Sequence, residues 1–304
     1  MADFPLDPEM VTFIDRYLEV SGLSTAITVA QQRDDYDKIV ACFKQPRPES
    51  ISSEDTYVDG RHGSIPIRTY HHAEGNERAR ILFFHGGGFI LGSLETHDDI
   101  CAEICAKTRF DLVSVNYRHA PEFLHPVQLD DVEDALQACW QENTILLGIS
   151  AGGALAAGLS HRRRNNRQKA AGQVLVYPAL GGDNFDLDSY RTNAEAPLLS
   201  TEDIRFYRGV RCKDGVPPDN DPEFYPLLAD DFAGLPPTIA ISADVDPLRD
   251  DSELYVEKLH AAGIKAKWIN EPGVVHDFVR ARHLSKRAGE AFDHIGESIC
   301  ELAG

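Results

Sequence analysis

Short apolar runs alternate with helix-like segments from about residue 65 to the C-terminus. An apolar run of this kind is typical of a buried strand, whereas apolar residues spaced three and four apart are typical of a helix. Strands that alternate with helices are joined by crossover connections and form a mostly parallel sheet. The sequence therefore predicts an α/β fold. The expected strands are 65–70, 80–84, 111–116, 144–148, 172–177, 238–242 and 266–270, and the expected helices are 96–108, 129–140, 150–162, 251–262 and one from about 281.

Two parts of the chain lie outside this alternation. Residues 1 to about 47 contain two amphipathic stripes, of which one ends near Gly22 and the other is closed by prolines, and both predict helices. From Gly181 to about Asp230 no strand is evident, and roughly 50 residues is too long for an ordinary connection. We therefore expect an inserted lid or cap, with 201–210 as its helical candidate and with the N-terminal helices packed on it.

The charge of the chain excludes several classes of partner. The 304 residues include 30 Lys and Arg against 49 Asp and Glu, which gives a formal net charge of −19. This charge repels phosphate backbones and anionic lipid headgroups, so nucleic acids and membrane surfaces are poor partners. No apolar stretch approaches the roughly 20 residues of a membrane-spanning helix, and the N-terminus has acidic residues where a signal peptide needs basic ones. We therefore expect a cytoplasmic protein.

The cysteines do not indicate a metal site. Six are present, and none forms a CxxC pair. Cys101 and Cys105 would share one face of a helix, but a zinc site needs further ligands and the local sequence offers only His97. Buried free thiols in a reducing cytoplasm, with no metal, are the better interpretation.

Ser150 lies in the pattern Gly148-Ile149-Ser150-Ala151-Gly152, between an expected strand and an Ala-rich expected helix. A G-x-S-x-G turn at a strand-to-helix junction holds a serine hydroxyl above the sheet, and small flanking residues let the turn close. A serine that only caps the helix is the alternative. The position directly after a buried apolar run favours a nucleophile at Ser150.

A serine that attacks a carbonyl needs backbone N–H groups to stabilise the oxyanion. His85-Gly86-Gly87-Gly88 directly follows an expected strand, and consecutive glycines allow the backbone to approach a ligand closely. The N–H of Ala151, the residue after the serine, is expected to be a further donor. A phosphate-binding glycine loop is the alternative, but the G-x-G-x-x-G pattern is incomplete and no Lys-Ser/Thr follows.

A serine nucleophile also needs a general base, and the histidine is expected last in the order serine, acid, histidine. Four histidines are candidates, of which His260, His283 and His294 fall within expected helices. His276 lies in a loop directly after an expected strand. Sites in open α/β sheets lie at the carboxyl ends of strands, so the position favours His276.

The acid is less clearly specified by position. Asp244, Asp246 and Asp250 all follow the expected strand 238–242. Asp246 lies deeper in the loop than Asp244, and Pro247 fixes its backbone, whereas Asp250 is suited to capping the next helix. The role requires a buried carboxylate that accepts a hydrogen bond from the histidine Nδ1–H. Spacing favours Asp246 only modestly, and the choice stays open at this point.

Five ordered motifs resemble those of the hormone-sensitive-lipase family of α/β-hydrolases, the esterases with an HGGG motif. They are HGGGF at 85–89, GSLETHD at 92–98, NYRHAPE at 116–122, GISAGG at 148–153 and DPLRD at 246–250. The resemblance implies an α/β-hydrolase fold, with a mostly parallel central sheet flanked by helices and a discontinuous helical cap. The implied bounds are 1–48 for the N-terminal cap helices, 49–182 and 231–304 for the catalytic domain, and 183–230 for the inserted cap segment.

The resemblance also implies a role for individual residues and resolves the choice of acid. Three positions depart from the family pattern, because Ile149 replaces an acid, His119 replaces a leucine and Asp277 replaces the glycine after the catalytic histidine. None of these departures removes a catalytic residue. The implied roles are Ser150 as nucleophile, Asp246 as acid, His276 as general base, Gly87, Gly88 and Ala151 as oxyanion donors, and His85 and Gly86 as supporting residues.

The implied function is that of a serine carboxylesterase, which hydrolyses short-chain esters of small molecules through an acyl-enzyme without a metal or cofactor. A deacetylase or amidase acting on a metabolite would use the same three residues. A non-catalytic small-molecule receptor on the same scaffold is a third hypothesis, which the retained Ser, Asp and His disfavour. Relatives often form homodimers, but the sequence reveals no interface.

Overall fold

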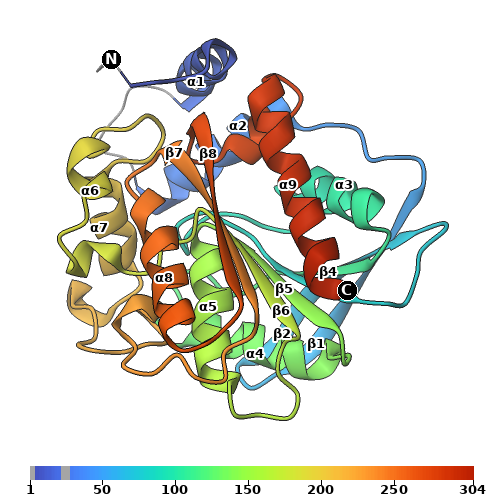
Figure 1. Cartoon of the computed structure of the whole chain (residues 1–304). Helices are drawn as coiled ribbons and strands as arrows, with labels where there is room; N and C mark the ends of the chain where they lie inside the picture. The colour runs from blue at the N-terminus through green and yellow to red at the C-terminus, as the bar shows by residue number, and fades with distance from the viewer. Residues whose placement is uncertain (1–3, 22–27) are drawn as a thin grey trace.

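One eight-stranded sheet forms the centre of the protein (Figure 1). The computed structural model describes residues 4–21 and 28–304. The strands are β1 (Ile51–Gly60), β2 (Gly63–His72), β3 (Arg80–Phe84), β4 (Asp111–Val115), β5 (Thr144–Ile149), β6 (Gly172–Val176), β7 (Thr238–Val245) and β8 (Ala266–Val275). Their order is β1-β2-β4-β3-β5-β6-β7-β8, and β2 runs antiparallel to both of its neighbours while the other neighbouring pairs are parallel. The mostly parallel sheet predicted from the sequence is confirmed.

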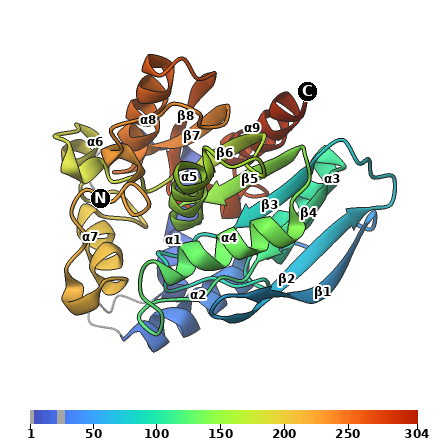
Figure 2. The same ribbon diagram turned by 90° about the horizontal axis from the view of Figure 1, so that it is seen from below.

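Helices cover both faces of this sheet (Figure 2). The longer helices are α1 (Pro8–Ser21), α2 (Val29–Phe43), α3 (Asp98–Thr108), α4 (Val127–Cys139), α5 (Ala151–Arg163), α7 (Thr201–Val210), α8 (Arg249–Ala261) and α9 (Lys286–Ala303). Successive strand residues point to opposite faces, so Ile81 and Phe83 of β3 pack in one core with α3 and α9. Leu82 and Phe84 pack in the second core with α4, α5 and α8.

Several elements differ from the sequence prediction, among them β2, which spans 63–72 instead of 65–70, and β7, which ends at 245 instead of 242. β1 was not expected, because eight of its ten residues are polar, charged or glycine and only Ile51 and Val58 are buried. β8 continues to Val275, past a register shift opposite 243–245, whereas we expected the strand to end at 270. The expected last helix from about 281 begins instead at Lys286, so His283 lies in the turn before it.

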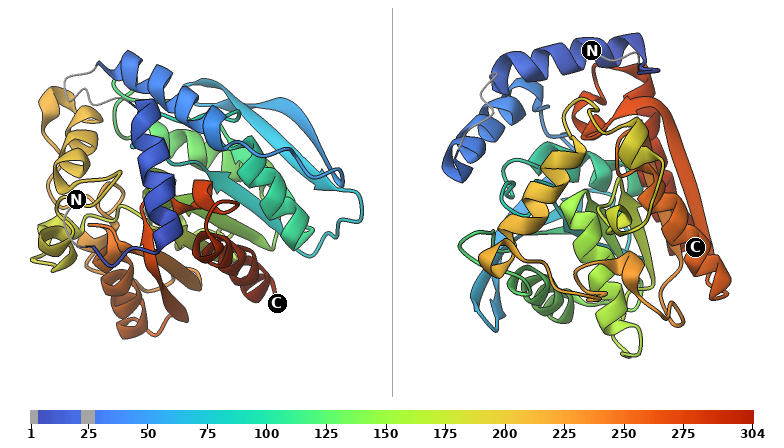
Figure 3. Two further views of the ribbon diagram at one scale, coloured as in Figure 1. Left: turned by 90° about the horizontal axis from the view of Figure 1, so that it is seen from above. Right: turned by 90° about the vertical axis from the view of Figure 1, so that its left-hand side faces the viewer.

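The N-terminal helices and part of the 183–230 segment lie close together in space. α1 and α2 lie at the same end of the molecule as α7 (Figure 3), and side chains of all three line one cavity. The segment around α7 contains otherwise only short turns and the four-residue helix α6 (Ser189–Thr192). The expected helix end near Gly22 lies outside the described residues, and the division into a cap and a catalytic domain stays a prediction.

The described residues also allow a few general statements about the chain. No helix within 4–21 and 28–304 combines the length and the apolar character needed to cross a membrane. All six cysteines are free thiols, but only Cys101 and Cys105 are buried, so the expectation of buried thiols is wrong for the other four. Among the same residues, no group of three or more His, Cys, Asp and Glu side chains is arranged to hold a metal ion.

Candidate active site

Ser150 occupies the sharp turn between β5 and α5, with backbone angles φ 55° and ψ −117°. A non-glycine residue with positive φ is strained, and strain of this kind accompanies nucleophile turns. The flanking residues have to be glycines. A Cβ at Gly148 would lie 2.2 Å from the carbonyl oxygen of Gly152, and a Cβ at Gly152 would lie 2.0 Å from the carbonyl oxygen of Phe84. The close approach of these backbones therefore explains the G-x-S-x-G pattern.

Ser150, His276 and Asp246 form one chain of hydrogen bonds. The Ser150 hydroxyl donates to His276 Nε2 across 2.9 Å, and His276 Nδ1 donates to Asp246 Oδ2 across 2.7 Å. Asp246 directly follows β7 and is fully buried, and the Leu248 N–H donates to its other oxygen across 2.8 Å. His276 directly follows β8. The carboxyl ends of three parallel strands thus place the three side chains together, as expected for this class of sheet.

The competing acids and histidines bond elsewhere. Asp244 accepts a hydrogen bond from Asn270 across 3.0 Å, and Asp250 accepts one from the Ser189 N–H across 2.8 Å. The structure therefore brings Asp246, and neither of the other two carboxylates, to the imidazole. The three histidines that competed with His276 for the role of base form contacts away from Ser150. They are His260 with the Ala266 carbonyl, His283 with Glu103, and His294 with Glu271.

The glycine loop after β3 lies beside Ser150. Gly87 and Gly88 adopt positive φ values of 118° and 58°, which glycine allows without strain. Within residues 4–21 and 28–304, no group accepts a hydrogen bond from the N–H of Gly87, Gly88 or Ala151. Gly87, Gly88 and Ser150 line one pocket, and Gly88, Ser150 and Ala151 line the next. The three N–H groups are thus available to a ligand bound at Ser150.

His85 supports this loop from inside the protein. Its ring is fully buried, its Nδ1 lies 2.8 Å from the Gly86 carbonyl, and it stacks on Tyr117 with ring centroids 4.3 Å apart. The Tyr117 hydroxyl donates to the His85 carbonyl across 2.8 Å. His119, which replaces a leucine of the family pattern, packs edge-on against the same ring at 5.5 Å. His85 therefore fixes the shape of the loop and does not contact the reacting atoms.

A second support lies behind His276 and was not predicted from the sequence. Asp277 has φ 64°, which explains why a glycine is usual there. Arg280 is buried and donates through Nε to Asp277 Oδ2 across 3.0 Å and through Nη2 to the Tyr36 hydroxyl across 2.6 Å. These bonds connect the loop of the histidine to α2. The only sequence signal was the unusual Asp277 itself.

Ser150 lines two cavity lobes, and Gly88, Leu199 and Tyr207 also line both. We call the first the His276 lobe, because His276 lines it together with Tyr17, Tyr36 and Leu198. The second, the Ala151 lobe, is lined by Ala151 and not by His276. Its further walls include Phe89, Tyr190, Arg211, Phe224, Tyr225 and Leu248.

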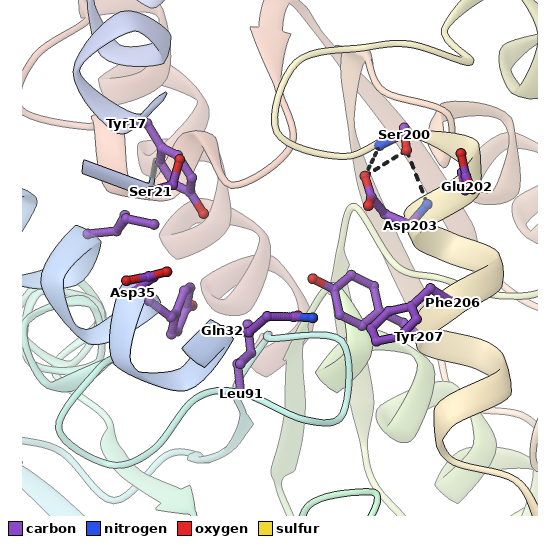
Figure 4. Close-up of a pocket in the computed structure, with 12 residues that line it drawn as sticks. Tyr17, Ser21, Gln32, Asp35, Leu91, Ser200, Glu202, Asp203, Phe206 and Tyr207 are labelled. Atoms are coloured by element: carbon purple, nitrogen blue, oxygen red, sulfur yellow. Dashed lines mark hydrogen bonds between the residues drawn. The ribbon is translucent and has the colours of Figure 1, made fainter. Parts of the chain in front are cut away.

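An outer cavity of about 570 Å³ is drawn in Figure 4. It shares the lining residues Tyr17, Tyr36, Leu91 and Tyr207 with the His276 lobe. Tyr17 and Asp35 stand on its α1–α2 side and Asp203 and Tyr207 on its α7 side. Tyr17 and Tyr207 also line the His276 lobe, so the outer cavity offers a route from the surface toward the serine.

Burial around the site lowers the pKa of several histidines. Desolvation lowers the pKa of His85 to about 3 and that of His119 to about 4, and it lowers the pKa of the more distant His161 to about 4. In the unfolded chain each would titrate near 6.5. The native state therefore holds these rings neutral at pH values where the unfolded chain protonates them.

We expect the free energy of unfolding to fall as the pH drops from 6.5 towards 4. In this range the unfolded chain binds about one more proton per such histidine than the native state does. Each such proton lowers the free energy of unfolding by roughly 1.4 kcal/mol for every unit by which the pH falls. Asp251 acts in the opposite direction, because burial raises its pKa to about 7 and its native carboxyl keeps a proton that the unfolded chain loses. Burial also lowers the pKa of His97 and His125 and raises the pKa of Asp131 and Glu253. Five histidines thus oppose three carboxyls, and the expected net loss is roughly 2–3 kcal/mol per pH unit. Urea titrations at pH 7, 6 and 5 measure it, and a flat or rising stability would contradict it.

Comparison with known proteins identifies the fold and the family. A family model of the α/β hydrolase fold matches residues 81–280. An arylesterase of Saccharolobus solfataricus is 28% identical over 297 residues, which cover 93% of this chain and 95% of that protein. The esterase LipI of Mycobacterium tuberculosis is 33% identical over 304 residues, which cover 94% of this chain and 92% of LipI.

Solved structures of esterases share this architecture. The esterase of the archaeon Pyrobaculum calidifontis superposes with a TM-score of 0.89 at 29% identity, over 99% of both chains. The carboxylesterase EstE1, cloned from a metagenomic library, superposes with a TM-score of 0.85 at 32% identity, over 93% of this chain and 100% of its own. The chain therefore belongs to the hormone-sensitive-lipase family of α/β-hydrolases.

Proposed function

We propose that this protein is a serine carboxylesterase that hydrolyses short-chain esters of small molecules. The observation that carries the proposal is the hydrogen-bond chain from the Ser150 hydroxyl through His276 to the buried carboxylate of Asp246. It lies beside three backbone N–H groups that have no acceptor among the described residues. The esterases to which the chain is similar support the same class of reaction.

In the first half of the proposed reaction, the Ser150 oxygen attacks the ester carbonyl while His276 Nε2 takes the hydroxyl proton. The carbonyl oxygen becomes negative and is stabilised by the N–H groups of Gly87, Gly88 and Ala151. Asp246 holds the imidazole in the tautomer with a free Nε2 and stabilises the imidazolium. His276 then gives the proton to the leaving alkoxide, and an acyl group stays on Ser150.

In the second half, water attacks the acyl-enzyme and the same imidazole takes a proton from it. Collapse of the second tetrahedral intermediate releases the carboxylic acid, and the proton returns to the serine oxygen. In the net reaction, one ester and one water molecule are converted to one carboxylic acid and one alcohol.

The two lobes divide the substrate between them. His276 must reach the leaving oxygen to protonate it, so the alcohol portion of the ester occupies the His276 lobe. The acyl chain then extends into the Ala151 lobe. That lobe has a volume of about 50 Å³ and is lined by Phe224, Tyr225 and Leu248, which favours a short acyl group.

Hydrolysis of p-nitrophenyl esters with acyl chains of two to twelve carbons tests this function. We expect turnover to be highest for the short chains and to fall for the long ones. The matching p-nitroanilides distinguish an esterase from an amidase or deacetylase. Higher turnover of the anilides would favour the amidase, and binding of the esters without any turnover would favour a receptor.

A further inference from the structure

Arg211 lies at the end of α7 and forms part of the wall of the Ala151 lobe. The residue is only 2% exposed. Its guanidinium lies between two rings, with its central carbon 3.7 Å from the centroid of Phe89 and 4.1 Å from that of Phe224. Because aromatic rings cover both faces, the guanidinium can form hydrogen bonds only along its edge.

No described carboxylate forms an ion pair with Arg211. One bond is formed along its edge, from Nη2 to His125 Nδ1 across 3.2 Å, and Nε is buried without an acceptor. His125 Nε2 in turn donates to Asp221 across 3.0 Å, so the imidazole separates that carboxylate from the guanidinium. Burial lowers the pKa of Arg211 to about 10, which leaves the group cationic at neutral pH.

Arg208 provides the internal comparison. It lines the same lobe, one turn earlier on α7, but forms an ion pair with Asp183. The lobe therefore contains one neutralised guanidinium and one that lacks a counter-ion. A buried cation without an anion is costly, and two ring faces offset only part of this cost. A substrate carboxylate in the lobe would supply both the missing charge and acceptors for the free edge.

We propose that Arg211 recognises a carboxylate on the acyl chain, so that half-esters of short dicarboxylic acids are preferred substrates. The inference rests on the proposed esterase function, which places the acyl chain in the Ala151 lobe. The net charge of −19 repels such a substrate at long range, but salt screens that repulsion, whereas the buried contact is screened much less.

The test compares monoethyl glutarate with ethyl pentanoate, which have the same ethyl alcohol and the same acyl length and differ by one terminal carboxylate. Release of ethanol gives kcat/KM for each ester in the wild-type protein, in Arg211→Met and in the matched control Arg205→Met. Arg205 is an exposed arginine on the same helix, so this control removes the same charge away from the lobe. A charge-assisted hydrogen bond is worth about 1.5–3 kcal/mol, so Arg211→Met is expected to lower the ratio of half-ester to neutral ester about 10- to 100-fold. Arg205→Met is expected to leave the ratio unchanged.

An unchanged ratio in Arg211→Met, or an equal loss for both esters, would overturn the proposal and make Arg211 a structural residue. If Arg211→Met fails to fold, the wild-type protein decides the question by its melting temperature. Glutarate is expected to raise this temperature and uncharged glutaramide is not, and an equal effect of the two would also overturn the proposal. Failure of the wild-type protein to hydrolyse any ester, with glutarate still bound, would contradict the esterase function and not the role of Arg211.

Discussion

Ser150→Ala is expected to lower kcat for short-chain esters by about 10⁶-fold. The hydroxyl forms the hydrogen bond to His276 Nε2 and lines the same pocket as Gly87 and Gly88, and no other serine, threonine or cysteine among the described residues lines that pocket beside the imidazole. The oxyanion donors stay in place, which leaves a small residual rate above that in water. The hydroxyl makes one hydrogen bond to a neighbouring side chain, so the free energy of unfolding is expected to change by less than about 1 kcal/mol.

The measurement is steady-state hydrolysis of p-nitrophenyl butyrate together with a urea titration. Ser64→Ala is the matched control, because Ser64 is exposed on β2 and lines none of the pockets around the site. We expect it to keep wild-type turnover. Activity of Ser150→Ala within tenfold of the wild type would show that another residue is the nucleophile.

Asp246→Asn is expected to lower kcat about 10⁴-fold with little effect on KM. The amide has nearly the same shape, so its oxygen can still accept the Leu248 N–H at the position of Oδ1. The amide NH₂ then faces His276 Nδ1 and cannot accept a proton from it. The imidazole is therefore held in the wrong tautomer, with a hydrogen on the nitrogen that has to take the serine proton.

Asp244→Asn is the matched control for this prediction. Asp244 was a rival for the acid by position, and the structure pairs it with Asn270 instead of the imidazole. We expect this variant to keep kcat within a few-fold of the wild type. A larger loss in Asp244→Asn than in Asp246→Asn would reverse the assignment of the acid.

The central strands could be predicted from the sequence because they are buried on both faces. All six residues of β5 and all five of β6 are buried, and such strands read as continuous apolar runs. β1 could not be predicted in this way, because it is an edge strand whose side chains are mostly exposed and polar. Its pairing with β2 depends on backbone hydrogen bonds, which leave no apolar pattern.

The serine turn, the glycine loop and His276 could be proposed from residue types placed at the ends of expected strands. Position alone left the acid open, because Asp244 and Asp246 are two residues apart, and it was the resemblance of the segment 246–250 to a family motif that selected Asp246. Their different partners in three dimensions agree with that choice. The contacts of Arg280 with Tyr36 and of Arg211 with Phe89 join residues more than 100 positions apart. Contacts between residues so far apart leave no local pattern in the sequence from which they could be predicted. A cytoplasmic location and a homodimer stay predictions from the sequence.

Covalent labelling tests the central claim most directly. The protein is incubated with a p-nitrophenyl phosphonate, and the modified peptide is located by mass spectrometry while ester turnover is followed. We expect one phosphonyl group per chain, attached to Ser150, and a loss of activity in proportion to the labelling. Full loss of activity with the label on another residue, or full activity with Ser150 labelled, would contradict the account.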